Sequence, residues 1–325
     1  MRVRSANAGP VRQRGVTLVE LLVAMAIALG LVLAATAAFV GSRQLFNAGT
    51  EAQAVEDALR FAGFVVKGIV RQAGYTDYTP DHVDAQGAAI ASSANPLASS
   101  ADPLDLDIVG ARNTRVRGTG NGYGRHDSRG VNGSDSLLVR FFGRSEAGGD
   151  GTEPDGSMVD CMGFGQAGPG AAGSSSAGDR AWSFFYVAEA ADGEPELYCK
   201  YRSDNIGRFK AAPLVRGIEV FKVAYGYDGN GDGIPERWLD AAQLEALAAS
   251  AAKTNDEWRK VVGLRIGMVA RSAHGNSGPG QGGELLYPLG LAFSGVSFKP
   301  PADGRLRHVA TFTVMLRNAA KDPQP

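Results

Sequence analysis

Residues 14–20 read Arg-Gly-Val-Thr-Leu-Val-Glu and open an apolar run that continues to Val40. From Leu21 to Val40 the chain has 20 residues without a formal charge, and Thr36 is the one polar residue among them. A helix rises ~1.5 Å per residue and a bilayer core is ~30 Å thick, so this run is typical of a membrane-spanning helix. Glu20, at the start of the run, decides what kind of spanning helix it is.

The segment before the run is basic and has no acidic residue. Its four arginines are Arg2, Arg4, Arg12 and Arg14. A basic leader followed by an apolar stretch is typical of a secretory signal or a membrane anchor. A removable signal would have its cleavage site after the run, whereas Gly15 lies before it. A plain anchor leaves Glu20 unexplained, because a carboxylate in a spanning helix costs free energy unless it has a partner or a function.

These residues resemble the processing site of a type IV prepilin: Gly15, then Val16-Thr-Leu-Val-Glu20, then the apolar run. The resemblance implies that prepilin peptidase cuts after Gly15, that Val16 becomes the N-methylated N-terminus, and that Glu20 is the glutamate of the family. Val16 stands where the family more often has Phe. In a bundle of apolar helices, Glu20 would pair with the α-amino group of an adjacent subunit and set the axial register, since an unpaired charge there is costly.

The apolar pattern continues beyond the run as an amphipathic helix. Small and apolar residues recur at steps of three and four over residues 45–73, and no proline interrupts them. We therefore predict one helix over Val16–Gln72, with Gly74 as its C-terminal stop. The predicted regions are a cytoplasmic leader (1–15), a transmembrane or filament-core half (16–40), an amphipathic half (41–74) and a periplasmic β-rich head (75–325).

The rest of the chain shows strand patterns. Runs rich in β-branched and aromatic residues predict strands at Ser136–Phe142, Trp182–Ala188, Glu196–Arg202, Leu214–Tyr227, Lys260–Arg271 and Arg305–Arg317. Asp240 is predicted to cap a short helix that extends through Leu247. Residues 75–134 have no clean period and are predicted as loops with one short strand at Leu104–Val109. The fold class is thus α+β, with the long helix packed on a largely antiparallel sheet.

Segments of the predicted head resemble PilW-type minor pilins of the type IV pilus. These segments are Cys161-Met-Gly, Trp182–Ala188, Glu196-Leu-Tyr-Cys-Lys, and residues 214–228, 258–266 and 307–318. The resemblance implies a minor pilin that helps to initiate pilus assembly near the tip, with roles in twitching motility and adhesion. It implies other minor and major pilins as partners. It also implies a single pass through the inner membrane, with a periplasmic head, before entry into the pilus.

Two alternatives stay open at this point. A J-type minor pseudopilin of a type II secretion system has the same helix, cleavage motif and head. A membrane-anchored, calcium-dependent adhesin that never polymerises would need the anchor but not the processing site. The length of 325 residues and the loops rich in glycine, which number 44 in the chain, favour the pilus.

The sequence has two cysteines, Cys161 and Cys199. A head outside the cytoplasm would lie in an oxidising compartment, where two such cysteines form a disulfide. The bridge would close a loop of about 38 residues and stabilise the fold by roughly 4 kcal/mol in the chain-entropy model. Two buried free thiols are the alternative.

Residues 228–236 read Asp-Gly-Asn-Gly-Asp-Gly-Ile-Pro-Glu and match the first nine positions of a calcium loop. The predicted ligands are four side chains and one backbone carbonyl, from Asp228, Asn230, Asp232, Ile234 and Glu236. The bidentate Glu of position 12 is missing, because Leu239 stands there, and no helix is expected before the loop. Calcium is thus the one predicted cofactor, and a solvated hairpin tip is the alternative.

Composition argues against two classes of function. The net charge is −1, and without residues 1–15 the chain has 29 basic and 34 acidic residues, so nucleic acid is not an expected partner. The histidines lack the spacing of metal ligands and are His82, His126, His274 and His308. The sequence has no nucleophile elbow and no phosphate loop, so we expect no enzyme.

Overall fold

A computed structural model of the chain describes residues 15–75, 105–116, 129–146, 153–168, 180–202, 209–249, 255–275, 283–293 and 295–318. Most of the predicted leader and most of the predicted loop region 75–134 lie outside these residues. Contacts within the chain divide it into two units, Met1–Thr50 and Glu51–Pro325. We call the second unit the head.

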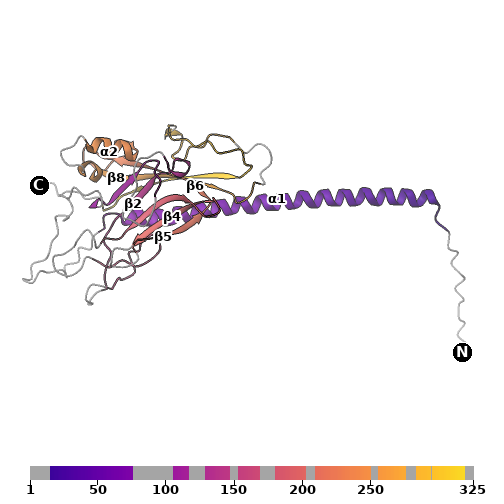
Figure 1. The fold of residues 1–325 in the computed structure, drawn as a ribbon, viewed down its shortest axis with the longest axis horizontal. Coiled ribbons are helices and arrows are strands. Elements are labelled where there is room, and N and C mark those ends of the chain that lie inside the picture. Colours follow the sequence, from indigo (N-terminus) through magenta and orange to yellow (C-terminus); the bar gives the residue numbers. More distant parts are fainter. Residues whose placement is uncertain are drawn as a thin grey trace, which may run out of the picture. The chain divides into compact units, whose positions relative to one another are not determined.

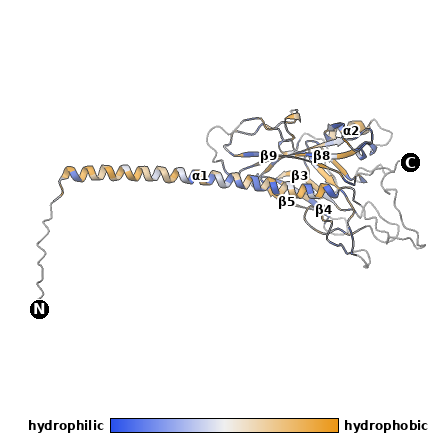
Figure 2. Cartoon of the chain, turned by 180° about the vertical axis from the view of Figure 1, so that it is seen from behind, coloured by the Kyte–Doolittle hydropathy of each residue, from blue (hydrophilic) through white to orange (hydrophobic). Residues whose placement is uncertain are grey.

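The predicted long helix is confirmed as α1, which runs over Leu18–Gln72. It begins two residues later than predicted. Within the first unit residues 15–40 are all exposed. Residues 21–40 have no charged side chain, and this part of the helix is coloured mostly as hydrophobic in Figure 2. In the part of the chain that the structure describes, α1 is the one helix long and apolar enough to cross a membrane by length and composition.

The head segment of α1 carries the predicted apolar stripe into the core. Its buried side chains are Val55, Leu59, Ala62, Val66, Ile69 and Val70. Leu45, at the start of the predicted stripe, belongs to the first unit and is 77% exposed. Gly74 has a φ of +69°, a conformation that favours glycine, and it stops the helix as predicted.

The head contains two antiparallel sheets (Figure 1). The first has the order β1-β2-β3-β4-β5, with β1 at Ile108–Ala111, β2 at Ser136–Val139, β3 at Ser183–Glu189, β4 at Pro195–Arg202 and β5 at Phe209–Arg216. The second has the order β7-β6-β8-β9, with β6 at Ile218–Tyr227, β7 at Arg237–Leu239, β8 at Val261–Arg271 and β9 at Arg307–Met315. The predicted α+β class with antiparallel pairing is therefore confirmed.

One predicted strand is wrong. Residues 214–227 do not form a single strand, because the chain turns at Gly217 and passes from β5 in one sheet to β6 in the other. Gly217 has a φ of +85°, and a Cβ there would lie 2.9 Å from the carbonyl oxygen of Arg271. This glycine is thus required for the crossing between sheets, and the continuous β-branched pattern around it hides the break.

Short elements complete the head. They are helices α2 at Ala241–Ala249 and α3 at Asp256–Arg259, with 3-10 turns η2 at Val131–Gly133 and η4 at Leu291–Phe293. Asp240 caps α2 as predicted, because its carboxylate accepts the Gln243 N–H at 2.8 Å while Gln243 Oε1 accepts the Asp240 N–H at 2.9 Å.

Buried Asp135 joins the two sheets. Its carboxylate accepts hydrogen bonds from the backbone N–H of Asn113 at 2.9 Å and of Val223 at 3.0 Å, and from Lys222 Nζ at 3.0 Å. Burial raises the pKa of Asp135, although Lys222 and the backbone donors oppose this. Because Asp135 precedes β2 and its partners include β6 residues, this cluster fixes how the sheets meet.

Candidate functional site

The first candidate site is the start of α1. Thr17 is the cap of this helix: its Oγ1 accepts the Glu20 N–H at 3.3 Å, and its carbonyl accepts the Leu21 N–H at 3.1 Å. The sequence signal for this cap is Thr-x-x-Glu, the pattern of a capping box, which our sequence analysis missed. Glu20 therefore lies in the first turn, where the helix dipole favours a negative charge.

Glu20 is a charged group on an apolar surface. Among the described residues it makes no ion pair, and its neighbours Val16, Val19 and Leu21 are 69%, 68% and 55% exposed. The uncovered apolar surface of α1 extends to Val40, which is 52% exposed. A helix that is apolar on every side requires lipid or other apolar helices around it, and in either environment the Glu20 carboxylate requires a partner.

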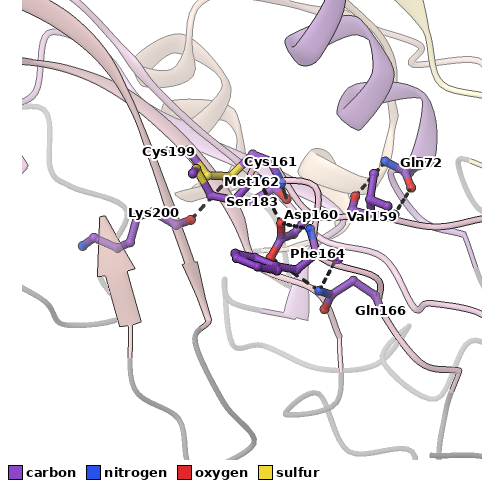
Figure 3. Close-up of a disulfide and its surroundings, with 10 residues drawn as sticks. All are labelled: Gln72, Val159, Asp160, Cys161, Met162, Phe164, Gln166, Ser183, Cys199 and Lys200. Carbon is purple, nitrogen blue, oxygen red and sulfur yellow. Dashed lines mark hydrogen bonds between the residues drawn. A yellow bond between two sulfur atoms is a disulfide. The ribbon is translucent and has the colours of Figure 1, made fainter. Parts of the chain in front are cut away.

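The second site is the disulfide between Cys161 and Cys199, which the structure confirms (Figure 3). The Cα atoms lie 6.0 Å apart, and both residues are buried. Cys199 belongs to β4 and lies opposite Phe185 of β3. The backbone N–H of Cys161 donates to Ser183 Oγ at 3.1 Å, which attaches the loop around Cys161 to the start of β3.

Gln72 connects this loop to the end of α1. Its side-chain nitrogen donates to the Val159 carbonyl at 3.0 Å, and its side-chain oxygen accepts the Val159 N–H at 3.0 Å (Figure 3). Asp160 closes the turn by accepting the N–H groups of Met162 at 2.8 Å and Phe164 at 3.0 Å. Burial raises the pKa of Asp160. Sequence reasoning missed both residues. The contact of Gln72 with Val159 leaves no local signal, whereas the turn at Asp160 could have been found from the Asp-x-x-Gly pattern of residues 160–163.

We expect the double substitution Cys161→Ser and Cys199→Ser to lower the free energy of unfolding by about 2–4 kcal/mol, because a loop of 38 residues is no longer closed in the unfolded chain. Urea unfolding of the full chain in detergent micelles, followed by the fluorescence of buried Trp182 and Trp258, measures this. The wild-type chain treated with a reductant is the control and should match the variant. A loss below about 1 kcal/mol would contradict the prediction.

The third site is the predicted calcium loop, which connects β6 to β7. All five predicted ligand residues lie in this one loop. Asp228 accepts the N–H groups of Gly231 at 2.6 Å and Gly233 at 2.7 Å. Burial alone would raise the pKa of Asp228, but these backbone donors bring it below its ordinary value. The carboxylate is therefore held in its charged form.

The other acids of the loop are also hydrogen-bonded to backbone groups. Glu236 accepts the N–H groups of Gly229 at 2.7 Å and Asn230 at 3.2 Å, and Asp232 accepts that of Ile234 at 2.8 Å. Among the residues that the structure describes, no three His, Cys, Asp or Glu side chains are grouped to hold a metal ion. The geometry is that of an ordered hairpin tip, and calcium binding stays a prediction.

Comparison with known families identifies two regions of the chain. Residues 184–318 match the family described as "Type IV Pilus-assembly protein W". Residues 11–37 match the family described as "Prokaryotic N-terminal methylation motif". The second match includes Gly15, Val16 and Glu20, and the first includes β3 to β9.

Among solved structures, a type IV-like pilin from Thermus thermophilus is similar to the chain at 19% sequence identity and a TM-score of 0.34. The similarity covers 58% of this chain and 81% of that pilin. No curated protein matches the chain.

Proposed function

Because this chain is a type IV pilus minor pilin of the PilW type, we propose that it is a processed filament subunit that helps to initiate pilus assembly near the tip. Prepilin peptidase cuts after Gly15 and Val16 becomes the N-methylated terminus. Before assembly, α1 anchors the chain in the inner membrane with the head in the periplasm. The partners are other minor and major pilins, and the pilus serves twitching motility and adhesion.

The observation that carries the proposal is the start of α1. A carboxylate lies in the first helical turn, within the methylation motif, at the start of a helix whose apolar side chains are uncovered up to Val40. An anchor alone would require the apolar surface but not Glu20. Transfer of the same helix from lipid to a bundle of pilin helices preserves its apolar environment, so the transfer costs little free energy.

Pairing of Glu20 with the N-terminal amine of a neighbouring subunit would fix the axial position of α1 relative to the neighbouring pilin helices. After cleavage at Gly15, Val16 carries a free α-amino group, four residues before Glu20. In an apolar bundle, an unpaired amine or carboxylate costs several kcal/mol, and a matched pair avoids this cost. The axial position that pairs the two groups is therefore preferred over positions that shift them apart.

The test is the mass of the mature chain. We expect protein isolated from cells that contain prepilin peptidase to begin at Val16, with one methyl group on its amine. Gly15→Arg should leave the leader attached, because a long charged side chain at the cleavage position blocks the peptidase. A wild-type chain that retains residues 1–15 in those cells would overturn the proposal.

The family match over residues 184–318 favours the pilus over a type II secretion system, since it is a pilus-assembly family. Deletion of the gene for this chain distinguishes a role in the pilus from a role in a type II secretion system. Loss of surface pili and twitching with normal secretion of enzymes supports the proposal. Loss of secretion with normal pili would assign the chain to the J-type pseudopilins.

Calcium binding by residues 228–236 is a second candidate function, favoured by their match to the first nine positions of a calcium loop. Calorimetric titration of the full chain in micelles with millimolar calcium tests it. Asp228→Ala should remove the heat of binding, whereas Asp192→Ala, in another exposed hairpin, should not. A flat wild-type titration would end this hypothesis.

A further inference from the structure

The head segment of α1 has a row of exposed residues on the side that faces away from the core. Its members recur at alternating steps of three and four, which places them on one side of a helix. They are Ala54, Asp57, Phe61, Phe64, Gly68 and Arg71, and all six are exposed. This spacing is that of the seam along which two helices pack in a coiled coil. We call these six residues the α1 seam.

The middle of the α1 seam is apolar. Phe61 is 52% exposed and Phe64 is 76% exposed, although the neighbouring Ala62 and Val66 are buried in the core. The surface around Gly68 is open, because no atom outside its own turn of helix lies within 4 Å of the position that a Cβ would take. The backbone of a second helix can therefore approach closely there, next to two aromatic side chains that it would cover.

The two ends of the α1 seam carry opposite charges. Asp57 lies before the two phenylalanines and Arg71 lies after them. Among the described residues neither side chain makes an ion pair, whereas Glu56 and Arg60, elsewhere on the same helix, lie 3.5 Å apart and pair with each other. At a rise of ~1.5 Å per residue, the charges of Asp57 and Arg71 are separated by ~21 Å along the helix.

A second copy of this chain does not match the α1 seam. In the proposed function all subunits insert their anchors into one membrane, so their α1 helices run parallel. Parallel helices in register would place Asp57 opposite Asp57 and Arg71 opposite Arg71. Like charges across such a seam repel each other, which selects against self-association. An antiparallel pair would match the charges but would send the two anchors in opposite directions.

We propose that the α1 seam binds the α1 helix of a different pilin, which runs parallel to it and has a basic residue opposite Asp57 and an acidic residue opposite Arg71. Between these charges the partner helix has apolar or small side chains that cover Phe61 and Phe64. The apolar contact supplies the affinity, and the two charge pairs determine the register and the partner. This inference rests on the proposed function and adds the kind of pilin that the chain selects.

The probe is this chain with its two seam charges reversed, Asp57→Arg with Arg71→Glu, because it supplies a parallel helix of the required charge pattern. Ala54→Cys is added to both the wild-type and the reversed-charge chain, and the two chains carry different tags. Oxidation in detergent micelles links the cysteines when the helices are parallel and in register. In an antiparallel pair they lie at opposite ends. We expect about fivefold more disulfide-linked dimer in the mixture than in either chain alone.

Association of the anchors within micelles contributes equally to every combination, so the comparison isolates the α1 seam. Phe61→Ser with Phe64→Ser, introduced into both chains, should remove the excess of linked dimer in the mixture. The fold of this variant should be retained, because both side chains are exposed. Equal linkage in the mixture and in the wild-type chain alone would overturn the proposal. An excess that persists without the two phenylalanines would overturn it as well.

The reversed-charge chain also separates this inference from the proposed function. In cells we expect it to enter filaments at least about fivefold less than the wild-type chain, while its mature form still begins at Val16. Normal incorporation would count against the α1 seam alone. Retention of residues 1–15 by the wild-type chain would instead overturn the proposed function, and the linkage experiment in micelles does not depend on processing or on filaments.

Discussion

Glu20→Ala is expected to abolish incorporation of the chain into filaments while leaving the chain in the membrane. The substitution removes the one carboxylate on the uncovered apolar surface of α1, so the amine of a neighbouring subunit would be left without its partner. An unpaired charge in an apolar bundle costs about 3–5 kcal/mol, which corresponds to a loss of two or more orders of magnitude in incorporation. Immunoblots of sheared filaments and of inner membranes measure the two pools.

Two further variants determine whether loss of the Glu20 charge causes the loss of incorporation. Glu20→Gln has nearly the same shape and should fail as Glu20→Ala does. Val19→Ala changes a neighbouring side chain that is 68% exposed, keeps the carboxylate, and should be incorporated at near wild-type levels. Normal incorporation of Glu20→Gln would show that the carboxylate does not set the register.

The long helix could be predicted from sequence because its signals are local. The apolar run, the stripe that follows it and the stop at Gly74 each occupy neighbouring positions in the chain. Most strands were also predicted, since β-branched and aromatic residues mark them. The error over residues 214–227 has a different origin: a single glycine changes the sheet to which the chain belongs, and its φ cannot be seen in a strand pattern.

The disulfide was predictable because two cysteines allow one intramolecular pairing. The contacts that surround it were not. Gln72 and Val159 are 87 positions apart, and so are Asn132 and Glu219. No local sequence pattern therefore indicates either contact. Such long-range polar pairs are selected by the packing of α1 and the sheets, which the sequence specifies only through the complete fold.

The ion pair between Glu219 and Arg307 is another such contact and joins β6 to β9. Arg307 Nε lies 2.5 Å from Glu219 Oε1. The Glu219 side chain is 1% exposed and the Arg307 side chain is 4% exposed. Arg307 also binds Asp303 at 2.7 Å. We expect Arg307→Ala to lower the free energy of unfolding by about 3–5 kcal/mol at pH 7, because it leaves a buried carboxylate with only the more distant Arg271 as a partner.

The loss in the free energy of unfolding caused by Arg307→Ala should become smaller as the pH falls. Burial raises the pKa of Glu219 even with Arg307 present, and loss of the guanidinium raises it further. A carboxyl group whose pKa is higher in the folded than in the unfolded chain binds a proton on folding, so the variant gains stability on acidification. Arg307 is the main group that holds the pKa of Asp303 at about 2, so the wild-type chain loses that contribution below pH 4, while the variant keeps only the smaller part that the backbone N–H of Arg305 supplies.

Urea unfolding of both chains in micelles at pH 7 and pH 4 measures this difference. Arg60→Ala is the matched control, because its pair with Glu56 is exposed and its loss should change stability by less than about 1 kcal/mol at either pH. A deficit of Arg307→Ala that is equal at pH 7 and pH 4 would mean that Glu219 stays charged in the variant. The role of Arg307 would then be packing between β6 and β9, and not compensation of a buried charge.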